Sequence, residues 1–260
     1  MTASGEPRRS LAVVIPMYNE EAGAEACVGA VCGVLKTLPV RTRLIVVNDG
    51  SSDRTKATLG RLAPAEPGLE VVHHEVNGGY GAALRTGVEA AHRGGFDYVL
   101  FMDSDLTNSP DDIPLFLEHM DRGADVIKAT RYRLGGAMRG VSIGRQIVSR
   151  CGGLVARLLF HCGLSDCTNG FRAVRTSVLM RMRLQERRFP VIVEELYCCL
   201  FLARRFAEVP VVLTGRDASL RPTSFAYRPS VFWRYLKYSV LASVRVRPTS
   251  RIIDDERGRR

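Results

Sequence analysis

Asp103 and Asp105, two aspartates separated by one serine, are the residues of this sequence best placed to bind a metal ion. Carboxylate oxygens are the ligands that hard divalent cations prefer, and a bound Mg²⁺ or Mn²⁺ can neutralise the diphosphate of a departing nucleotide. An Asp-x-Asp pair alone is a weak signal, because solvated loop carboxylates and helix caps are common. Here the pair follows an apolar run at 98–102, and this position at a strand end favours a metal-binding and catalytic role.

The elements that must position these aspartates alternate along the chain between short apolar runs and segments with apolar residues at helical spacing. The expected strands cover residues 11–15, 44–47, 71–72, 98–102, 125–130 and 209–213. The expected helices cover residues 20–38, 54–62, 81–93, 110–122, 145–161, 176–182, 193–205 and 229–246. This alternation predicts an α/β fold with a mostly parallel central sheet and helices on both faces. The glycine-rich segment 131–144 is expected to be a mobile loop.

Three further polar or glycine-rich segments follow expected strands. They are VIPMYNE at 14–20, VVNDGSSD at 46–53 and NGGYGAA at 77–83. Because ligands in open α/β sheets bind at the carboxyl ends of the strands, we expect these segments to gather around the Asp-Ser-Asp loop.

Together these four segments resemble the nucleotide-binding motifs of family 2 glycosyltransferases with the GT-A fold. The resemblance implies that the site holds a nucleotide sugar and a divalent metal ion, with Asp105 as the main metal ligand and Asp103 in support. An anionic side chain at a strand end can accept hydrogen bonds from a base N–H or from ribose hydroxyls, which agrees with this assignment. The implied nucleotide-sugar contacts are Pro16, Tyr18, Glu20, Asp49, Gly79, Asp103, Ser104 and Asp105.

Glycines before a helix also occur in dinucleotide-binding folds, where phosphate binds at a helix N-terminus. The segment at 77–81 follows the third expected strand rather than the first, and no acidic residue follows at the spacing which that fold requires. A nicotinamide oxidoreductase is therefore the weaker enzyme hypothesis. Tight NAD binding without nucleotide-sugar binding would favour it.

The second half of the sequence narrows the resemblance to the polyprenyl-phosphate mannosyl- and glucosyltransferases. The matching segments are TRY at 130–132, Arg145, Ser149-Arg150 and SDCTNGFR at 165–172, and the match covers roughly residues 11–216. In that family the positions that match Arg131, Arg145 and Ser149 bind the acceptor phosphate. Guanidinium groups suit this role because they form forked, charge-assisted hydrogen bonds with phosphate.

The sequence departs from the family pattern in its late segment. The family carries Arg-x-x-Gly-x-Ser-Lys, whereas residues 216–225 are RDASLRPTSF, without the glycine and the lysine. Either Arg216 or Arg221 is therefore the expected phosphate contact from this segment, and the lipid-phosphate assignment is weakened.

Glu194 matches a glutamate that faces the active site in the family, and Glu195 is the neighbouring alternative. Its role depends on the acceptor. A lipid phosphate is already an anionic nucleophile and needs no general base, whereas an alcohol needs a carboxylate within reach of its proton.

Composition supports an anionic partner. The chain of 260 residues has 37 Lys and Arg against 27 Asp and Glu, a formal charge of +10 that suits nucleotide phosphate, lipid phosphate or a membrane surface. An arginine-heavy coding bias is the alternative explanation of this charge. We expect no nucleic-acid partner. The 7 cysteines include no C-x-x-C pair and several lie in apolar stretches, which indicates reduced thiols in a cytoplasmic protein without structural zinc.

The expected domain organisation is a flexible N-terminus at 1–10, a catalytic domain at 11–225, an amphipathic helical segment at 226–248 and a flexible charged tail at 249–260. No apolar segment is long enough to be a signal peptide or a membrane span. The helix at 229–246 carries apolar residues on one side and basic residues elsewhere, so it either packs on its own domain or contacts the inner face of the membrane as a peripheral anchor.

The sequence thus predicts an inverting, metal-dependent glycosyltransferase. The resemblance makes GDP-mannose the first choice of donor, ahead of a UDP- or dTDP-hexose, and a polyprenyl phosphate the first choice of acceptor. Two alternatives stay open. The same fold can transfer a sugar to the hydroxyl of a soluble small molecule or natural product, or the protein can bind nucleotide and membrane without catalysis.

Overall fold

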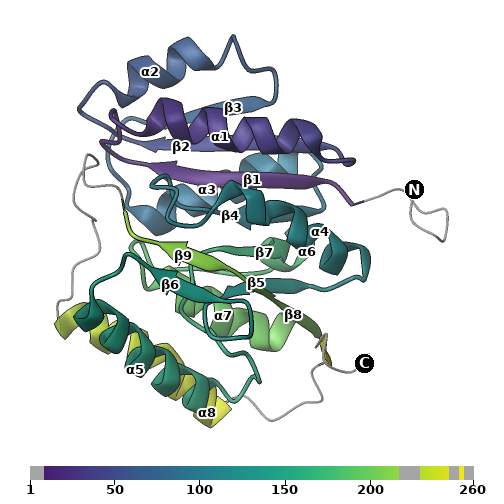
Figure 1. The fold of residues 1–260 in the computed structure, drawn as a ribbon, viewed down its shortest axis with the longest axis vertical. Helices are drawn as coiled ribbons and strands as arrows, with labels where there is room; N and C mark the ends of the chain where they lie inside the picture. The colour runs from purple at the N-terminus through teal and green to yellow at the C-terminus, as the bar shows by residue number, and fades with distance from the viewer. Residues whose placement is uncertain (1–8, 217–228, 246–251, 255–260) are drawn as a thin grey trace.

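The computed structural model describes residues 9–216, 229–245 and 252–254, which form one eight-stranded sheet with the order β10-β8-β5-β7-β4-β1-β2-β3 and a two-stranded sheet, β6-β9 (Figure 1). The strands are β1 (Leu11–Met17), β2 (Thr42–Asp49), β3 (Leu69–His74), β4 (Tyr98–Phe101), β5 (Val126–Thr130), β6 (Ala137–Arg139), β7 (Arg172–Arg175), β8 (Arg205–Pro210), β9 (Val212–Thr214) and β10 (Ile252–Asp254). The helices are α1 (Ala24–Thr37), α2 (Thr55–Leu62), α3 (Tyr80–Arg93), the 3₁₀ turn η1 (Pro110–Asp112), α4 (Ile113–Asp121), α5 (Ile143–Phe160), α6 (Thr176–Leu179), α7 (Val191–Leu202) and α8 (Pro229–Arg245).

The main sheet is parallel except at β7, which runs antiparallel to both of its neighbours, β4 and β5. The prediction of an α/β fold with a mostly parallel sheet is confirmed. Sequence analysis missed β7, which lies between an expected turn and an expected helix. Because β7 is reversed, its first residue lies at the edge where β4 and β5 end, and Arg172 pairs in register with Phe101 and Lys128.

Helices cover both faces of the sheet, as expected, because alternate strand residues point to opposite sides. On one side Ala12 and Val14 of β1 belong to a buried cluster with residues of α3, α6 and α7. On the other side Val13 and Ile15 belong to a cluster with residues of α1, α2 and α4. Burial on both faces explains why β1 is a continuous apolar run instead of an alternating one.

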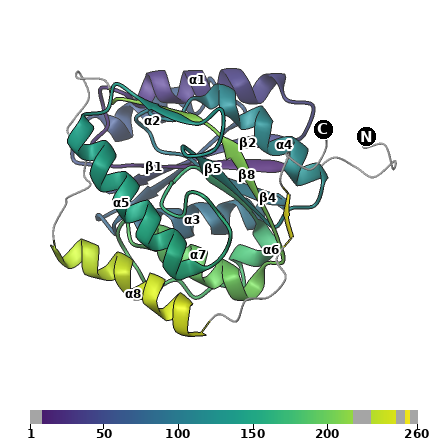
Figure 2. The same cartoon turned by 60° about the horizontal axis from the view of Figure 1, so that its bottom comes forward.

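Helices α5 and α8 lie side by side along one end of the molecule, outside the helices that cover the sheet (Figure 1 and Figure 2). Their buried residues, such as Phe160 and Tyr238, join the cluster on the α3 side, and α8 also packs on α7. The expected helix at 229–246 is thus present and packs on its own domain along one side. Within the described part of the chain, no helix is both long enough and apolar enough to cross a bilayer.

Besides β7, two more short strands lie where the sequence predicted none. β6 lies within the expected loop at 131–144 and pairs with β9, and β10 lies within the expected flexible tail and pairs with β8. The expected domain limits at 225 and 248 fall outside the described residues.

Gly87 tests the contact between α3 and β1. A Cβ added there would collide with a methyl group of the buried Val14, so Gly87→Ala should destabilise the fold by about 1–3 kcal/mol despite the better helix propensity of alanine. Gly33→Ala in the exposed face of α1, where no atom lies within 4 Å of the added Cβ, should instead stabilise the protein by about 0.5–1 kcal/mol. Urea unfolding measures both. Equal effects would contradict the close packing of α3 on β1.

Candidate active site

The acidic pair lies in the loop after β4, and its carboxylates have few partners. The Tyr80 hydroxyl donates to Oδ1 of Asp103 at 3.0 Å, and Thr107 donates to Oδ1 of Asp105 from its backbone N–H at 3.2 Å and from its hydroxyl at 2.9 Å. Burial, followed by the negative charge of Asp105, raises the pKa of Asp103 from 3.8 to about 6. The pair therefore concentrates negative charge in a site that water solvates poorly.

Glu20 adds a third carboxylate beside the acidic pair, and Arg216 pairs with it and with Asp105. Glu20 follows β1, the strand beside β4, and is buried. The Arg216 guanidinium lies between the two acidic segments, with Nη1 2.9 Å from Oδ2 of Asp105 and Nη2 3.1 Å from Oε2 of Glu20. Arg216, expected to bind the acceptor phosphate, thus lies beside the expected metal and nucleoside residues.

The donor atoms of the acidic pair fit a divalent metal ion of the expected type. No group of three or more His, Cys, Asp or Glu side chains is arranged to hold a metal among the residues that the structure describes. Mg²⁺ is usually bound by one or two carboxylates, with substrate phosphates and water as the other ligands. Asp103 and Asp105 supply two such carboxylates, and the pKa of Asp103 is raised first by burial and then by the charge of Asp105, both of which a bound cation would offset.

Asp49 holds the glycine-rich loop after β3. Its carboxylate accepts hydrogen bonds from the backbone N–H groups of Gly78 and Gly79, both at 2.8 Å, and contacts Nδ1 of His74 at 2.6 Å. The expected nucleoside residues Pro16 and Tyr18 are half-buried, and Ser104 is buried. The structure thus brings the expected donor residues to one edge of the sheet, although Asp49 already binds protein groups.

The glycines of this loop allow a second chain segment to approach. Gly79 has a φ of 92°, and a Cβ at Gly79 or Gly81 would collide with the backbone carbonyl of Arg187 or Glu186. The Gly81 N–H donates to the Arg187 carbonyl at 2.8 Å. The segment around Glu186 therefore packs directly on the N-terminal end of α3.

Glu194 supports this packing segment. Its carboxylate accepts hydrogen bonds from the backbone N–H groups of Gln185 and Glu186, both at 2.9 Å, and from the Tyr238 hydroxyl at 3.1 Å. These partners are Gln185, Glu186 and Tyr238, and its role as a base stays a prediction.

Glu195, the neighbouring alternative, is paired with Arg172. Nε and Nη2 of Arg172 each lie 2.6 Å from a carboxylate oxygen of Glu195, and both side chains are almost fully buried. Arg172 also lies over the Phe101 ring, and its charge opposes the rise in the pKa of Asp103. Sequence analysis gave Arg172 and Tyr80 no role, although each lies within a segment that carried the resemblance.

The expected acceptor residues form a second group after β5. Arg131 donates to both oxygens of the fully buried Asp166, at 2.7 and 3.0 Å, to Ser149 at 3.1 Å and to Thr168 at 3.1 Å. Arg131 and Ser149 are thus together, as expected. The side chain of Arg145 and all of Arg221 lie outside the described residues. Asp166 fixes the guanidinium, and sequence analysis quoted it without assigning it this role.

One loop joins the two groups. Asp166 holds Arg131, and a Cβ at Gly170 would lie 3.6 Å from Oδ2 of Asp103. Between them, the Asn169 N–H donates to Asp166 at 3.1 Å, and the Asn169 carbonyl accepts from the buried Lys128 ammonium at 2.9 Å. The loop thus sets the acidic pair and the Arg131–Ser149 pair at one edge of the sheet.

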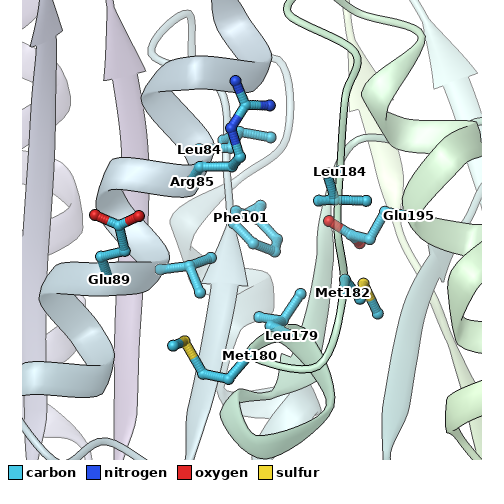
Figure 3. A pocket seen from close by; sticks show the side chains of 10 residues that line it. Leu84, Arg85, Glu89, Phe101, Leu179, Met180, Met182, Leu184 and Glu195 are labelled. Carbon is cyan, nitrogen blue, oxygen red and sulfur yellow. The ribbon is translucent and has the colours of Figure 1, made fainter.

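A separate cavity of about 120 Å³ lies between α3, α6 and α7 and is lined in part by Phe101 (Figure 3). Leu84 and Leu184 give it apolar walls, and Arg85 at its rim donates to the Glu186 carbonyl at 3.1 Å. Glu195 also lines it, but the Arg172 ion pair neutralises that carboxylate. Glu89, which is exposed on α3, also lines the cavity.

Comparisons with known proteins agree with this geometry. Residues 12–183 match the sequence model of the family described as glycosyl transferase family 2. Over 226 residues the chain is 29% identical to polyprenol monophosphomannose synthase of Mycolicibacterium smegmatis. The aligned region covers 85% of this chain and 84% of that protein. Over 213 residues it is 33% identical to undecaprenyl-phosphate 4-deoxy-4-formamido-L-arabinose transferase of Edwardsiella ictaluri, covering 80% of this chain but only 61% of that protein.

A solved structure confirms the expected GT-A fold. The crystal structure of glucosyl-3-phosphoglycerate synthase from Mycobacterium tuberculosis aligns with a TM-score of 0.63 and 24% identity, over 93% of this chain and 82% of that chain.

The pKa of Asp103 predicts how stability depends on pH. Because the pKa is raised from 3.8 to about 6, the folded protein binds this proton more tightly than the unfolded chain, and the resulting stability is lost as pH rises through 6. In metal-free buffer Asp103→Asn should therefore be more stable than wild type by about 1–3 kcal/mol near pH 7.5, with no advantage near pH 4. Urea unfolding at both pH values measures this. A difference that does not change with pH would contradict the raised pKa.

Proposed function

Because the chain belongs to glycosyl transferase family 2, we propose that it transfers a hexose from a nucleotide-sugar donor to a polyprenyl phosphate, with inversion at the anomeric carbon and with a divalent metal ion. The observation that carries this proposal is the loop that joins the acidic pair to the Arg131–Ser149 pair. One group suits a metal-bound diphosphate and the other suits a phosphate acceptor, so two phosphorylated substrates can meet at this edge of the sheet.

The donor side is assigned by the chemistry of its groups. Glu20 and Asp49 suit the hydroxyls and N–H groups of a nucleoside, and Asp103 and Asp105 suit a Mg²⁺ or Mn²⁺ ion. When bound, the ion would offset the charge that develops on the departing nucleoside diphosphate. GDP-mannose is the first choice of donor because the relative from Mycolicibacterium smegmatis is named for mannose transfer. Because another relative is named for transfer of an arabinose derivative, the transferred sugar has to be determined by experiment.

The acceptor is proposed from what the carboxylates already bind. Glu194 accepts hydrogen bonds from three protein groups and Glu195 is paired with Arg172, so both expected bases already have protein partners. An alcohol acceptor would need such a base, whereas a phosphate monoester attacks as an anion. These contacts favour a lipid phosphate over the hydroxyl of a soluble acceptor. Both relatives compared above are named for polyprenol or undecaprenyl-phosphate chemistry.

Arg131 is suited to orient the attacking phosphate. Asp166 fixes its guanidinium through two hydrogen bonds, and the Ser149 hydroxyl lies beside it at 3.1 Å. A fixed fork loses little conformational freedom when it binds phosphate oxygens, which helps to hold the acceptor in line with the anomeric carbon.

An exposed apolar surface on α5 and α8 suits contact with the membrane that holds a polyprenyl phosphate. On α5, Ile147, Leu154 and Leu158 are each more than half exposed and lie on one face, and Trp233 on α8 is 66% exposed. Neither helix contains Asp or Glu, whereas both carry exposed arginines or lysines. Apolar side chains among basic ones suit the interface of a bilayer with anionic lipids. Peripheral binding at the cytoplasmic face is therefore part of the proposal.

Transfer to lipid is the decisive assay. With labelled GDP-mannose, Mn²⁺ and polyprenyl phosphate, the wild type should produce label that extracts into organic solvent. Asp105→Ala should lower the rate about a hundredfold or more, since several kcal/mol of leaving-group stabilisation is lost. Asp121→Ala, which removes an exposed carboxylate at the end of α4, is the control.

Undiminished turnover by Asp105→Ala would overturn the metal assignment. Label transferred only to water-soluble acceptors would favour the soluble-acceptor alternative, and no turnover with any nucleotide sugar would favour a binding role.

Vesicle binding tests the surface on α5 and α8. Replacing Ile147 and Leu154 with glutamate should weaken binding to vesicles that contain anionic phospholipid by about tenfold or more, because apolar burial is lost and negative charge is added. Leu115→Glu alters an exposed leucine on α4 and should bind like wild type. Cosedimentation measures all three. Equal binding, or self-association of the wild type through this face in place of vesicle binding, would exclude membrane docking here.

A further inference from the structure

Arg216 binds the carboxylates that the proposed donor and metal ion would need. Its Nη1 lies 2.9 Å from Oδ2 of Asp105, and its Nη2 lies 3.2 and 3.1 Å from the two oxygens of Glu20. Thr107 already donates two hydrogen bonds to Oδ1 of Asp105. Oδ2 is therefore the oxygen of Asp105 that Thr107 leaves open to a metal ion. In this structure the Arg216 guanidinium contacts that oxygen.

We propose that Arg216 is an internal counter-ion that supplies positive charge to this site before the donor arrives, and that the metal ion and the nucleotide sugar displace it. The inference rests on the proposed function for the identity of the displacing ligands. Its physical basis is competition, because a guanidinium and a divalent cation cannot both contact Oδ2 of Asp105 at close range without repulsion.

The contacts of Arg216 also suit an exchange of partners. Its buried Nε has no hydrogen-bond partner among the described residues, so one donor is left for an oxygen ligand. The preceding strand is held to the acidic loop, since the backbone N–H and the hydroxyl of Thr214 both donate to the Thr107 carbonyl, at 2.8 and 3.2 Å. Arg216 therefore stays beside the acidic loop when its side chain leaves Asp105, and its guanidinium remains close to any phosphate bound there.

The test is the affinity of the full chain for Mn²⁺ alone, without nucleotide, measured by isothermal titration calorimetry. Arg216→Gln removes the competing charge and should bind Mn²⁺ roughly tenfold more tightly than wild type. Arg216→Lys keeps a charge but has one donor nitrogen in place of a fixed fork with two, so its affinity should lie between the two. A purely structural role for Arg216 would instead leave Mn²⁺ affinity unchanged or weaken it.

Arg175→Gln is the matched control, because Arg175 is a partly buried arginine paired with Asp125 at the other end of β7. It should bind Mn²⁺ like wild type. If Arg216→Gln does not fold by circular dichroism, the comparison of Arg216→Lys with wild type decides. Equal affinities, weaker binding by the Arg216 variants, or no Mn²⁺ binding by any form would overturn the inference.

The transferase proposal and the counter-ion role of Arg216 can fail independently of each other. If the affinities rank as expected but no sugar reaches any acceptor, competition at Asp105 stands and the transferase proposal fails. If wild type makes lipid-linked sugar while the affinities are equal, the counter-ion role alone fails.

Discussion

The rest of this site depends on holding like charges together at the edge of a sheet. Burial and the charge of Asp105 raise the pKa of Asp103, and Glu20 adds a third carboxylate from the segment after the neighbouring strand, β1. Such a group is unfavourable unless positive charge compensates it. In the structure Arg216 supplies that charge directly, and Arg172 acts on Asp103 from the other side. The three carboxylates therefore favour the binding of a cation at this site.

The reversed strand β7 is what brings positive and negative groups to the same edge. Were it parallel, Arg172 would lie at the opposite end from Asp103, and the loop before it would not reach both groups. As built, that loop holds Arg131 through Asp166 and passes Oδ2 of Asp103 at Gly170. A single connection therefore contacts both the proposed donor group and the proposed acceptor group, and Tyr80 of α3 and Ser149 of α5 add further contacts to them.

The sequence alone predicted the parallel strands β1, β2 and β4, which position the acidic residues. Buried parallel strands are continuous apolar runs, so the ends of β1, β2 and β4 were visible, and with them Glu20, Asp49 and Asp103. Short β7 gave no such signal, because four residues that include two arginines do not form an apolar run. Periodicity also could not separate Glu194 from Glu195, since both are buried on α7 and face different partners. The apolar stripe of α5 was missed because an exposed stripe and a buried one have the same spacing.

The altered late segment that begins at Arg216 is weaker evidence against a phosphate-binding site when the position of Arg216 in the fold is considered. Arg216 follows β9, which is fixed by pairing with β6 and by the contact of Thr214 with Thr107. These contacts all precede the positions where the family's glycine and lysine are missing, so the placement of Arg216 does not depend on them. A guanidinium, moreover, can span Asp105 and Glu20 with two different nitrogens, which the single ammonium of a lysine cannot do. Retaining the arginine while losing the lysine therefore preserves a cation whose geometry matches the acidic site.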